Sequence, residues 1–504
     1  INITLDSASA AAVVDTVLAA GAVTDADKHL NKVNEYGRND HLGGQTLNLE
    51  FVSANPTGPI HIGGTRWAAV GDAMARVLEA NGAKVVREYY FNDHGEQINR
   101  FAKSLVAAWA EANNLGEAGY QTETPCDGYK GAYINEIAAR VQAEAESDGV
   151  DLTALAHQDQ GLNDDGEPLG EADTEVREEF RKRAVPMMFD EIQKSMKDFR
   201  VNFDVWFHEN SLYADGKVDA AIEELKSRGD IFDKDGATWF ESTKHGDDKD
   251  RVIIKSNGEF AYFAADIAYH YNKLATRGFA KAIDVWGADH HGHVARMKGA
   301  MDAIGLHGED LDVVLMQMVN LMRDGQPVRM SKRTGNAITL TDLLEEVPID
   351  SARFLFNMHD AGSGIDFDLD QAVKTDNDNP VYYVQYAHAR ICSILKKMES
   401  EGVQFAGAEK VDATLLTEPS EMDLIRMLAA FPQEIVMAAE KYDPSRINRF
   451  VIDLASAFHR FYGNCRIQGA DPAVQQARLA LCIGVKNAIF NVLTMFKINV
   501  PEKM

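Results

Sequence analysis

Several short segments either alternate between apolar and polar residues or are short apolar runs, and each of these segments predicts a strand. They cover residues 47–51, 84–87, 251–255, 260–263, 282–286 and 313–316. Between the first two, apolar residues recur at helical spacing, as at Trp67, Val70 and Met74. Asn257-Gly258 predicts a hairpin turn. Strands that alternate with helices indicate an α/β fold, here a Rossmann-type domain with a doubly wound parallel sheet.

From residue 379 onward the spacing is only helical, which predicts a C-terminal all-α bundle. Its expected helices cover residues 381–400, 421–440, 445–463 and 473–497. The strongly charged, helical stretch at about 116–200 predicts a subdomain inserted into the α/β domain. We therefore expect an N-terminal segment at 1–40, the α/β domain at 41–345, a connector at 346–378 and the bundle at 379–504.

Length and composition narrow the class of protein. The 504 residues are too many for one core. No apolar run is long enough to span a membrane, and no signal peptide is recognisable. The first residue is Ile1, so we expect a longer natural chain. Four cysteines without a CxxC pair indicate a reduced, cytoplasmic protein that has neither disulfides nor a cysteine-bound zinc ion.

The net charge of −27, from 51 basic and 78 acidic residues, is unfavourable for a nucleic-acid partner. Net charge does not describe the local potential, however, and basic residues can gather on one face. We interpret the acidity as a property of the whole surface that promotes solubility.

A loop rich in proline and glycine, residues 53–64, lies between the strand at 47–51 and the next helix. Such a loop can direct backbone amides and a helix N-terminus toward phosphate groups. His61 adds an imidazole donor at this place. The alternative is a structural histidine that caps the helix.

A second loop, residues 329–336, follows the strand at 313–316 and a turn at Asp324-Gly325. Its Lys332 and Arg333 are suited to neutralising a triphosphate leaving group. Taken alone, this loop would be interpreted as a solvated basic turn.

Together the two loops resemble the HIGH and KMSKS motifs of class I aminoacyl-tRNA synthetases. Gly64 replaces the second histidine of the first motif, and Arg329 and Arg333 replace the first lysine and last serine of the second. Either the role of the second histidine is dispensable, or another side chain, such as His94 or Lys84, takes it over. Further stretches resemble the arginyl-tRNA synthetase family, namely residues 89–97, 246–252, 286–293 and 379–390, and the resemblance runs from about residue 46 to the C-terminus.

The resemblance implies a two-step reaction with L-arginine, ATP and tRNA(Arg) as partners, in a monomer. It implies that ATP is bound as its Mg²⁺ complex, that no cofactor is tightly bound, and that arginine activation needs bound tRNA. The catalytic residues would be His61 and Lys332. The ATP-binding residues would be His61, Gly63, Gly64, Asp289, His290, His293, Met330, Ser331, Lys332 and Arg333. The arginine-binding residues would be Glu50, Ser53, Asn55, Tyr262, Asp266 and Asp289, and the tRNA-binding residues Tyr386 and Met504. The first 40 residues would be the remnant of an N-terminal tRNA-contacting domain.

Several simpler interpretations stay open at this point. Glu50 could be an exposed strand residue, and Asp266 could be a helix N-cap. The three histidines within residues 290–293 could bind zinc, but no further ligands complete a set. Another class I synthetase, such as the cysteine or glutamate enzyme, and a non-catalytic RNA-binding relative are the competing functions.

Overall fold

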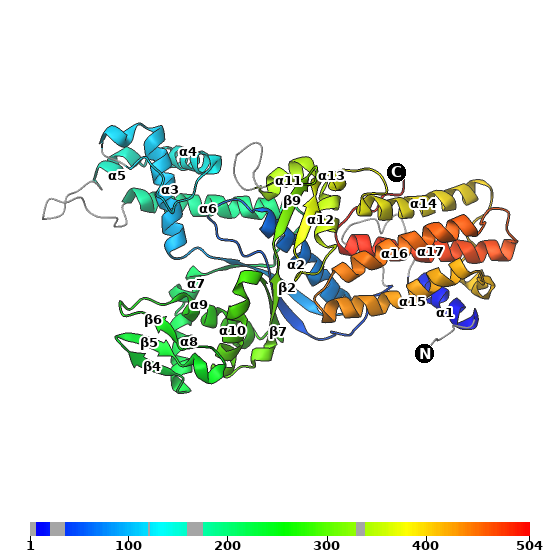
Figure 1. Ribbon diagram of the computed structural model, residues 1–504, viewed down its shortest axis with the longest axis horizontal. Helices are drawn as coiled ribbons and strands as arrows, with labels where there is room; N and C mark the ends of the chain where they lie inside the picture. The colour runs from blue at the N-terminus through cyan, green and yellow to red at the C-terminus, as the bar shows by residue number, and fades with distance from the viewer. Residues whose placement is uncertain (1–6, 21–35, 119–120, 159–174, 329–337) are drawn as a thin grey trace.

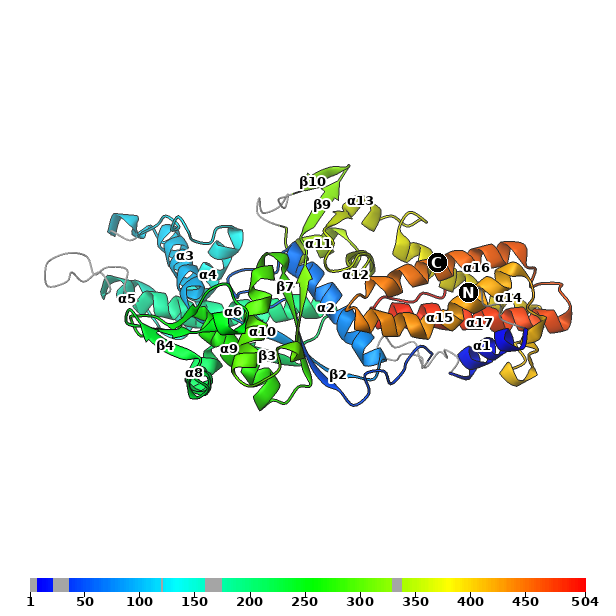
Figure 2. The ribbon, with the colours of Figure 1, turned by 60° about the horizontal axis from the view of Figure 1, so that its bottom comes forward.

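The computed structural model describes residues 7–20, 36–118, 121–158, 175–328 and 338–504. The molecule is elongated, with the α/β domain at its centre, a helical bundle at one end and a helical subdomain at the other (Figures 1 and 2).

A five-stranded parallel sheet forms the centre of the α/β domain. Its strand order is β3-β2-β1-β7-β8, and every neighbouring pair is parallel. The strands are β1 (Thr46–Glu50), β2 (Lys84–Phe91), β3 (Val205–His208), β7 (Lys281–Gly287) and β8 (Leu311–Met316). The predicted α/β fold is confirmed. β3 was not predicted, because its four residues, VWFH, are too few to show alternation.

Helices and two small sheets surround the central sheet. The helices are α2 (Ile62–Ala80), α7 (Asn210–Ala214), α8 (Lys217–Ser227), α9 (Tyr262–Tyr271), α10 (His291–Ala303), α11 (Leu340–Glu346), α12 (Ile349–Phe356) and α13 (Leu369–Ala372). One small sheet contains β4 (Ile231–Lys234), β5 (Ala237–Phe240) and β6 (Arg251–Ile254). The other contains β9 (Val319–Arg323), β10 (Gln326–Val328) and β11 (Ile365–Asp368).

The strand predicted at 260–263 is wrong. Only Phe260 forms an isolated antiparallel bridge, with Ile254, and Tyr262 already begins α9. The turn at Asn257-Gly258 does return the chain, since Lys255 N donates to Glu259 O at 2.8 Å. The last two residues of this apolar run, Tyr262 and Phe263, lie in the first turn of α9. An apolar run of only four residues does not distinguish a helix from a strand.

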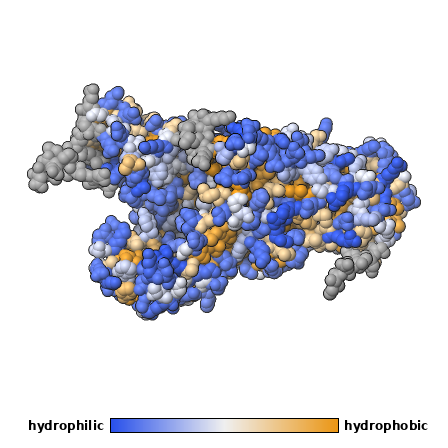
Figure 3. Space-filling view, in the orientation of Figure 1, coloured by the Kyte–Doolittle hydropathy of each residue, from blue (hydrophilic) through white to orange (hydrophobic). Residues whose placement is uncertain are grey.

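The helical subdomain has a hydrophobic core of its own. It contains α3 (Glu96–Ala112), α4 (Ala132–Ser147), α5 (Leu152–Gln158) and α6 (Glu175–Asp198), all of which contribute buried residues to one cluster. Phe101 and Trp109 of α3 pack there with Phe180 of α6. Figure 3 shows a hollow between these helices and the lobe that contains α7–α10.

The C-terminal bundle contains α14 (Pro380–Ser400), α15 (Pro419–Glu440), α16 (Ser445–Asn464) and α17 (Pro472–Met495), as the helical spacing predicted within two residues at each end. The N-terminal helix α1 (Ser7–Ala19) packs on α15 and α17, where Val14 and Val17 are buried. Among the described helices, α17 has the length and hydropathy to cross a membrane, but 83% of that window is buried in the structure. It is therefore the core helix of the bundle.

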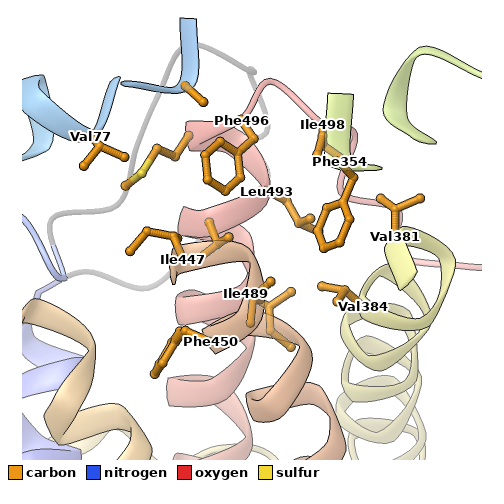
Figure 4. Packing of buried hydrophobic residues seen from close by; sticks show 14 of the residues in the cluster. Val77, Phe354, Val381, Val384, Ile447, Phe450, Ile489, Leu493, Phe496 and Ile498 are labelled. Carbon is orange, nitrogen blue, oxygen red and sulfur yellow. The ribbon is translucent and has the colours of Figure 1, made fainter. Parts of the chain in front are cut away.

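The bundle packs directly against the α/β domain. Val77 of α2 lies in the same hydrophobic cluster as Leu493 and Phe496. Phe354 of α12 belongs to this cluster too and lies beside Leu493 (Figure 4). Arg353 is fully buried at this junction, and its guanidinium bonds Asp72 of α2 and the carbonyl of Phe496. The helix that follows the His61 loop is thus tied to the last helix of the bundle.

Candidate active site at the carboxyl edge of the sheet

The functional residues expected from the sequence gather at one edge of the central sheet. The chain leaves β1 toward β2 and β3 on one side, and returns to β7 and β8 on the other side of β1. At such a topological switch point, the loops after the strands diverge and leave a crevice for a ligand. Glu50 ends β1, Glu209 directly follows β3, and Asp289 lies two residues after β7. Lys84, at the start of β2, lies at the opposite edge and is wrong as a substitute for the missing histidine.

His61 is the N-cap of α2. Its Nδ1 atom accepts the backbone N–H groups of Gly63 and Gly64 at 3.1 and 3.4 Å. Burial lowers the pKa of His61, so the ring is neutral near pH 7. Because Nδ1 is an acceptor, the proton lies on Nε2, which is free to donate to a ligand. The capping alternative is therefore confirmed, and it leaves a role for Nε2 in phosphate binding open.

Gly63 and Gly64 are required by the packing of this loop. A Cβ atom on Gly63 would lie 2.9 Å from Cε1 of His61, and one on Gly64 would lie 3.0 Å from the Ile60 side chain. Both glycines are buried. A side chain at position 64 would therefore require Ile60 to shift by a few tenths of an ångström.

The chain leaves β1 through a strained turn. Val52 and Ser53 both have positive φ, 69° and 41°, which a β-branched residue rarely adopts. The turn is held because Ser53 Oγ accepts from Tyr90 N at 3.0 Å and the Tyr89 hydroxyl donates to Ala54 O at 2.8 Å. Strain of this kind is concentrated at functional sites.

Beyond this turn, the Asn55 side-chain amide bonds the Gln97 side chain of α3. Asn55, His61 and Gln97 all line a cavity of about 660 Å³. The turn thus directs the His61 loop toward the inserted subdomain.

Glu50 is buried, so its interpretation as an exposed strand residue is wrong. Lys273, itself fully buried, donates to Glu50 Oε2 at 2.5 Å and to Asp284 Oδ1 at 2.8 Å. Burial alone would raise the pKa of Asp284, but Lys273 and His270 outweigh it and lower that pKa to about 2. Lys273 lies in a π-helical turn, Asn272–Thr276, that directly follows α9. Such turns are frequent at functional sites.

A buried carboxylate that the sequence did not reveal lies beside this network. Glu209 is 3% exposed, and the Tyr90 and Tyr213 hydroxyls donate hydrogen bonds to it. Burial, together with the charge of Asp266, raises the pKa of Glu209 to about 7. No Lys or Arg of the described residues forms an ion pair with Glu209. The sequence did contain a signal for this residue, because the apolar residues 205–207 followed by the polar residues 208–210 mark the end of a short strand.

Asp266 lies in the middle of α9, whose N-cap is Ala261, so its interpretation as an N-cap is wrong. Its carboxylate lies 3.3 Å from His293 Nε2. Tyr262, the first residue of α9, is 64% exposed and reaches toward Gly95. Glu209, Asp266 and Tyr90 lie close enough to influence one another electrostatically, and we call these three residues the acidic cluster.

The loop after β7 contains the other expected ATP ligands. His290 Nδ1 lies 3.2 Å from Asp289 Oδ1, and both side chains are exposed. His293 packs against Phe263 and Trp286. Within the described part of the chain, no three His, Cys, Asp or Glu side chains are grouped to hold a metal ion. Met330, Ser331, Lys332 and Arg333 lie outside the described residues.

The two residues expected to contact tRNA lie on the bundle. Tyr386 of α14 is half-buried and stacks on His459 at 5.8 Å, with the Arg390 guanidinium 5.9 Å from its ring. Met504, the last residue, is 46% exposed.

Comparison with known proteins identifies the family. A family model described as "tRNA synthetases class I (R), catalytic domain" matches residues 27–376, and one described as "DALR anticodon binding domain" matches residues 384–504. The arginine–tRNA ligase of Bifidobacterium longum (strain NCC 2705) is 67% identical, with 100% of this chain and 85% of that protein covered. The arginine–tRNA ligase of Bifidobacterium animalis subsp. lactis is 52% identical, with 100% and 84% covered.

A solved structure gives the same result. A chain described as an arginyl-tRNA synthetase from Campylobacter jejuni has 29% identity and a TM-score of 0.81, covering 99% of this chain and all of that one. The chain therefore belongs to the arginyl-tRNA synthetases, a family of class I aminoacyl-tRNA synthetases.

Proposed function

We propose that this protein is an arginine–tRNA ligase. It activates L-arginine with ATP to arginyl-adenylate, releasing pyrophosphate, and transfers the arginyl group to the 2′-hydroxyl of the terminal adenosine of tRNA(Arg), releasing AMP. The observation that carries this proposal is the acidic cluster at the carboxyl edge of the sheet. Burial, together with the charge of Asp266, raises the pKa of Glu209, and a bound cation would favour its charged form.

A guanidinium group suits the acidic cluster by its chemistry. It is planar and always charged, and it binds carboxylates through paired N–H donors. In the proposal, Glu209 and Asp266 hold the guanidinium, and Tyr262 contacts it as well. Ser53 and Asn55 bind the amino and carboxylate end of arginine. Glu50 contributes negative charge below it, while Lys273 fixes the orientation of its side chain.

ATP is proposed to bind on the His61 side. Activation is mostly positioning and charge stabilisation, so the protein needs donors more than a strong base. His61 Nε2–H donates to the phosphates, Lys332 stabilises the departing pyrophosphate, and Met330, Ser331 and Arg333 are further ATP-binding residues. Asp289, His290 and His293 contact the nucleotide at the end of β7. Mg²⁺ accompanies ATP as its counter-ion and needs no protein cage of its own.

The remaining parts of the proposal concern the whole molecule. Tyr386 and Met504 contact the anticodon region of tRNA(Arg), and residues 1–40 belong to a segment that contacts tRNA. The proposed domains are the α/β domain at 41–345, the connector at 346–378 and the helical bundle at 379–504. The protein acts as a cytoplasmic monomer.

A charging assay tests the proposal. The protein is incubated with ATP, total tRNA and each of the twenty amino acids in turn. We expect arginine to be attached, and pyrophosphate exchange with arginine to be weak until tRNA is added. Attachment of a different amino acid, or of none, would contradict the proposal, and strong exchange without tRNA would contradict its tRNA dependence.

A further inference from the structure

The cavity beside His61 is built from two distant parts of the chain. One wall is the loop between β1 and α2, including Asn55 and His61. The other comes from the inserted subdomain, through Gln97 of α3 and residues 129–133 at the start of α4. The Tyr133 hydroxyl donates to Thr57 O at 2.9 Å, which seats the subdomain on the loop. The subdomain therefore contributes to the site itself.

The charge of this cavity differs from that of the protein. The chain has a net charge of −27, yet the described residues that line the cavity include no Asp or Glu. Lys130 is the one Lys or Arg among these lining residues. His61 is neutral near pH 7 because burial lowers its pKa. The described lining of the cavity therefore carries one positive charge near pH 7, that of Lys130.

Lys130 makes no polar contact that would stabilise the described part of the fold. Its side chain is exposed, and it forms no hydrogen bond, ion pair or cation–π contact with the rest of the described chain. Asp127, three residues before Lys130 in the chain, forms an ion pair with Arg100, whose Nε lies 2.9 Å from Asp127 Oδ2. Removal of Lys130 therefore costs the folded protein little, whereas a lysine held at the rim of a cavity without acids is suited to binding an anion.

We propose that Lys130 is a phosphate-binding residue of the active site, supplied by the inserted subdomain and acting together with His61. Gly64 contributes no side chain to the cavity, so among the described residues Lys130 is the cation that lines it together with His61. The ligand is a nucleotide phosphate, either of ATP or of the 3′-terminal nucleotides of tRNA. This inference rests on the proposed function, because that function brings both nucleotides to this place.

Variants of the full-length chain with intact tRNA test the inference. Lys130→Met removes the charge, Lys130→Arg keeps it, and Lys182→Met is the matched control. Lys182 lies on α6 of the same subdomain, is 66% exposed, and lies 3.6 Å from Glu179. The readouts are the KM for ATP and the KM for tRNA in arginine charging, and direct binding of a non-hydrolysable ATP analogue and of tRNA with and without its terminal adenosine.

Loss of one charge-assisted phosphate contact should weaken binding by about ten- to a hundredfold. We expect Lys130→Met to raise one KM by this factor, with Lys130→Arg close to the original protein and Lys182→Met unchanged. A rise for ATP identifies ATP as the source of the phosphate, and a rise for tRNA identifies its 3′ end. Values within twofold of the original protein for both ligands, or an equal effect of Lys182→Met, would overturn the inference.

The binding measurements separate this inference from the proposed function. If the original protein attached no arginine, the proposed function would fail. The ATP analogue and tRNA would still report whether Lys130 binds phosphate.

Discussion

Lys273 Nζ lies 2.5 Å from Glu50 Oε2, and this pair joins the end of β1 to the π-helical turn that follows α9. Neither side chain is more than 10% exposed, and Lys273 also reaches Asp284 of β7 at 2.8 Å. One lysine thus forms ion pairs with two buried carboxylates on neighbouring strands.

We expect Lys273→Met to destabilise the α/β domain strongly. The substitution leaves Glu50 and Asp284 buried without their cation, which costs about 3–5 kcal/mol. Denaturant unfolding, followed by tryptophan fluorescence, measures the effect. The control is Lys281→Met, whose partly exposed pair with Asp312 should contribute less than about 1 kcal/mol. Equal effects of the two substitutions would contradict this account of the network.

The same network predicts a loss of stability in acid. The pKa of Asp284 is about 2 in the folded protein and about 3.9 in an unfolded chain. Because the folded pKa is the lower one, the stabilisation is complete above pH 4 and is lost as the pH falls from about 4 to 2, by roughly 2–3 kcal/mol. Unfolding measured across this range in the original protein and in Asp284→Asn should show a flatter dependence for the variant. Identical slopes would exclude Asp284 as the group responsible.

The two nitrogen atoms of His61 can be separated by substitution. Asparagine is a good N-cap, so His61→Asn should preserve the start of α2 but lose the Nε2–H donor. We expect a stability change below about 0.5 kcal/mol and a fall in kcat of about 100- to 1000-fold, the effect of one preorganised donor. His61→Ala should lose both functions and cost about 1 kcal/mol more. A fully active His61→Asn variant would show that the imidazole only caps the helix.

Restoring a histidine at position 64 should harm the protein. A side chain there meets Ile60 at 3.0 Å already at its Cβ atom, so Gly64→His should cost about 1–3 kcal/mol through overpacking. Gly64→Ala should cost less, because only one methyl group is added. Thermal unfolding and the rate of adenylate formation check both variants. A stable and faster Gly64→His enzyme would contradict the packing argument.

Arginine affinity should depend on the ionisation of Glu209. Its pKa of about 7 in the free protein means that a cation binds more tightly as the pH rises through 7, because the carboxylate then needs no deprotonation. We expect the KM for arginine to fall between about pH 6 and 8 and the decrease to disappear in Glu209→Gln, whose KM should be raised at every pH. The KM for ATP, measured in parallel, should keep its original pH dependence in the variant. A pH-independent KM for arginine in the original protein would exclude this role.

The local spacing of apolar residues predicted many of the helices and strands. The bundle helices, α2, β1, β7 and β8 were predictable because apolar spacing is a property of neighbouring residues and survives in any tertiary context. The His61 loop could be located for the same reason, since proline, glycine and a flanking strand and helix mark it. The resemblance that named arginine, ATP and tRNA also depended only on the order of residues in the chain.

The tertiary structure decided which side chains meet. β3 is four residues long, so its place at the edge of the sheet, and with it the position of Glu209, depended on pairing with β2. The burial of Glu50 and Lys273 followed from strand order and from the π-helical turn. Lys130 reached the His61 cavity only because the inserted subdomain folds back onto the loop. The sequence alone determined the family and most of the helices and strands. Burial, ion pairing and protonation arise between residues far apart in the chain, which only the folded structure brings together.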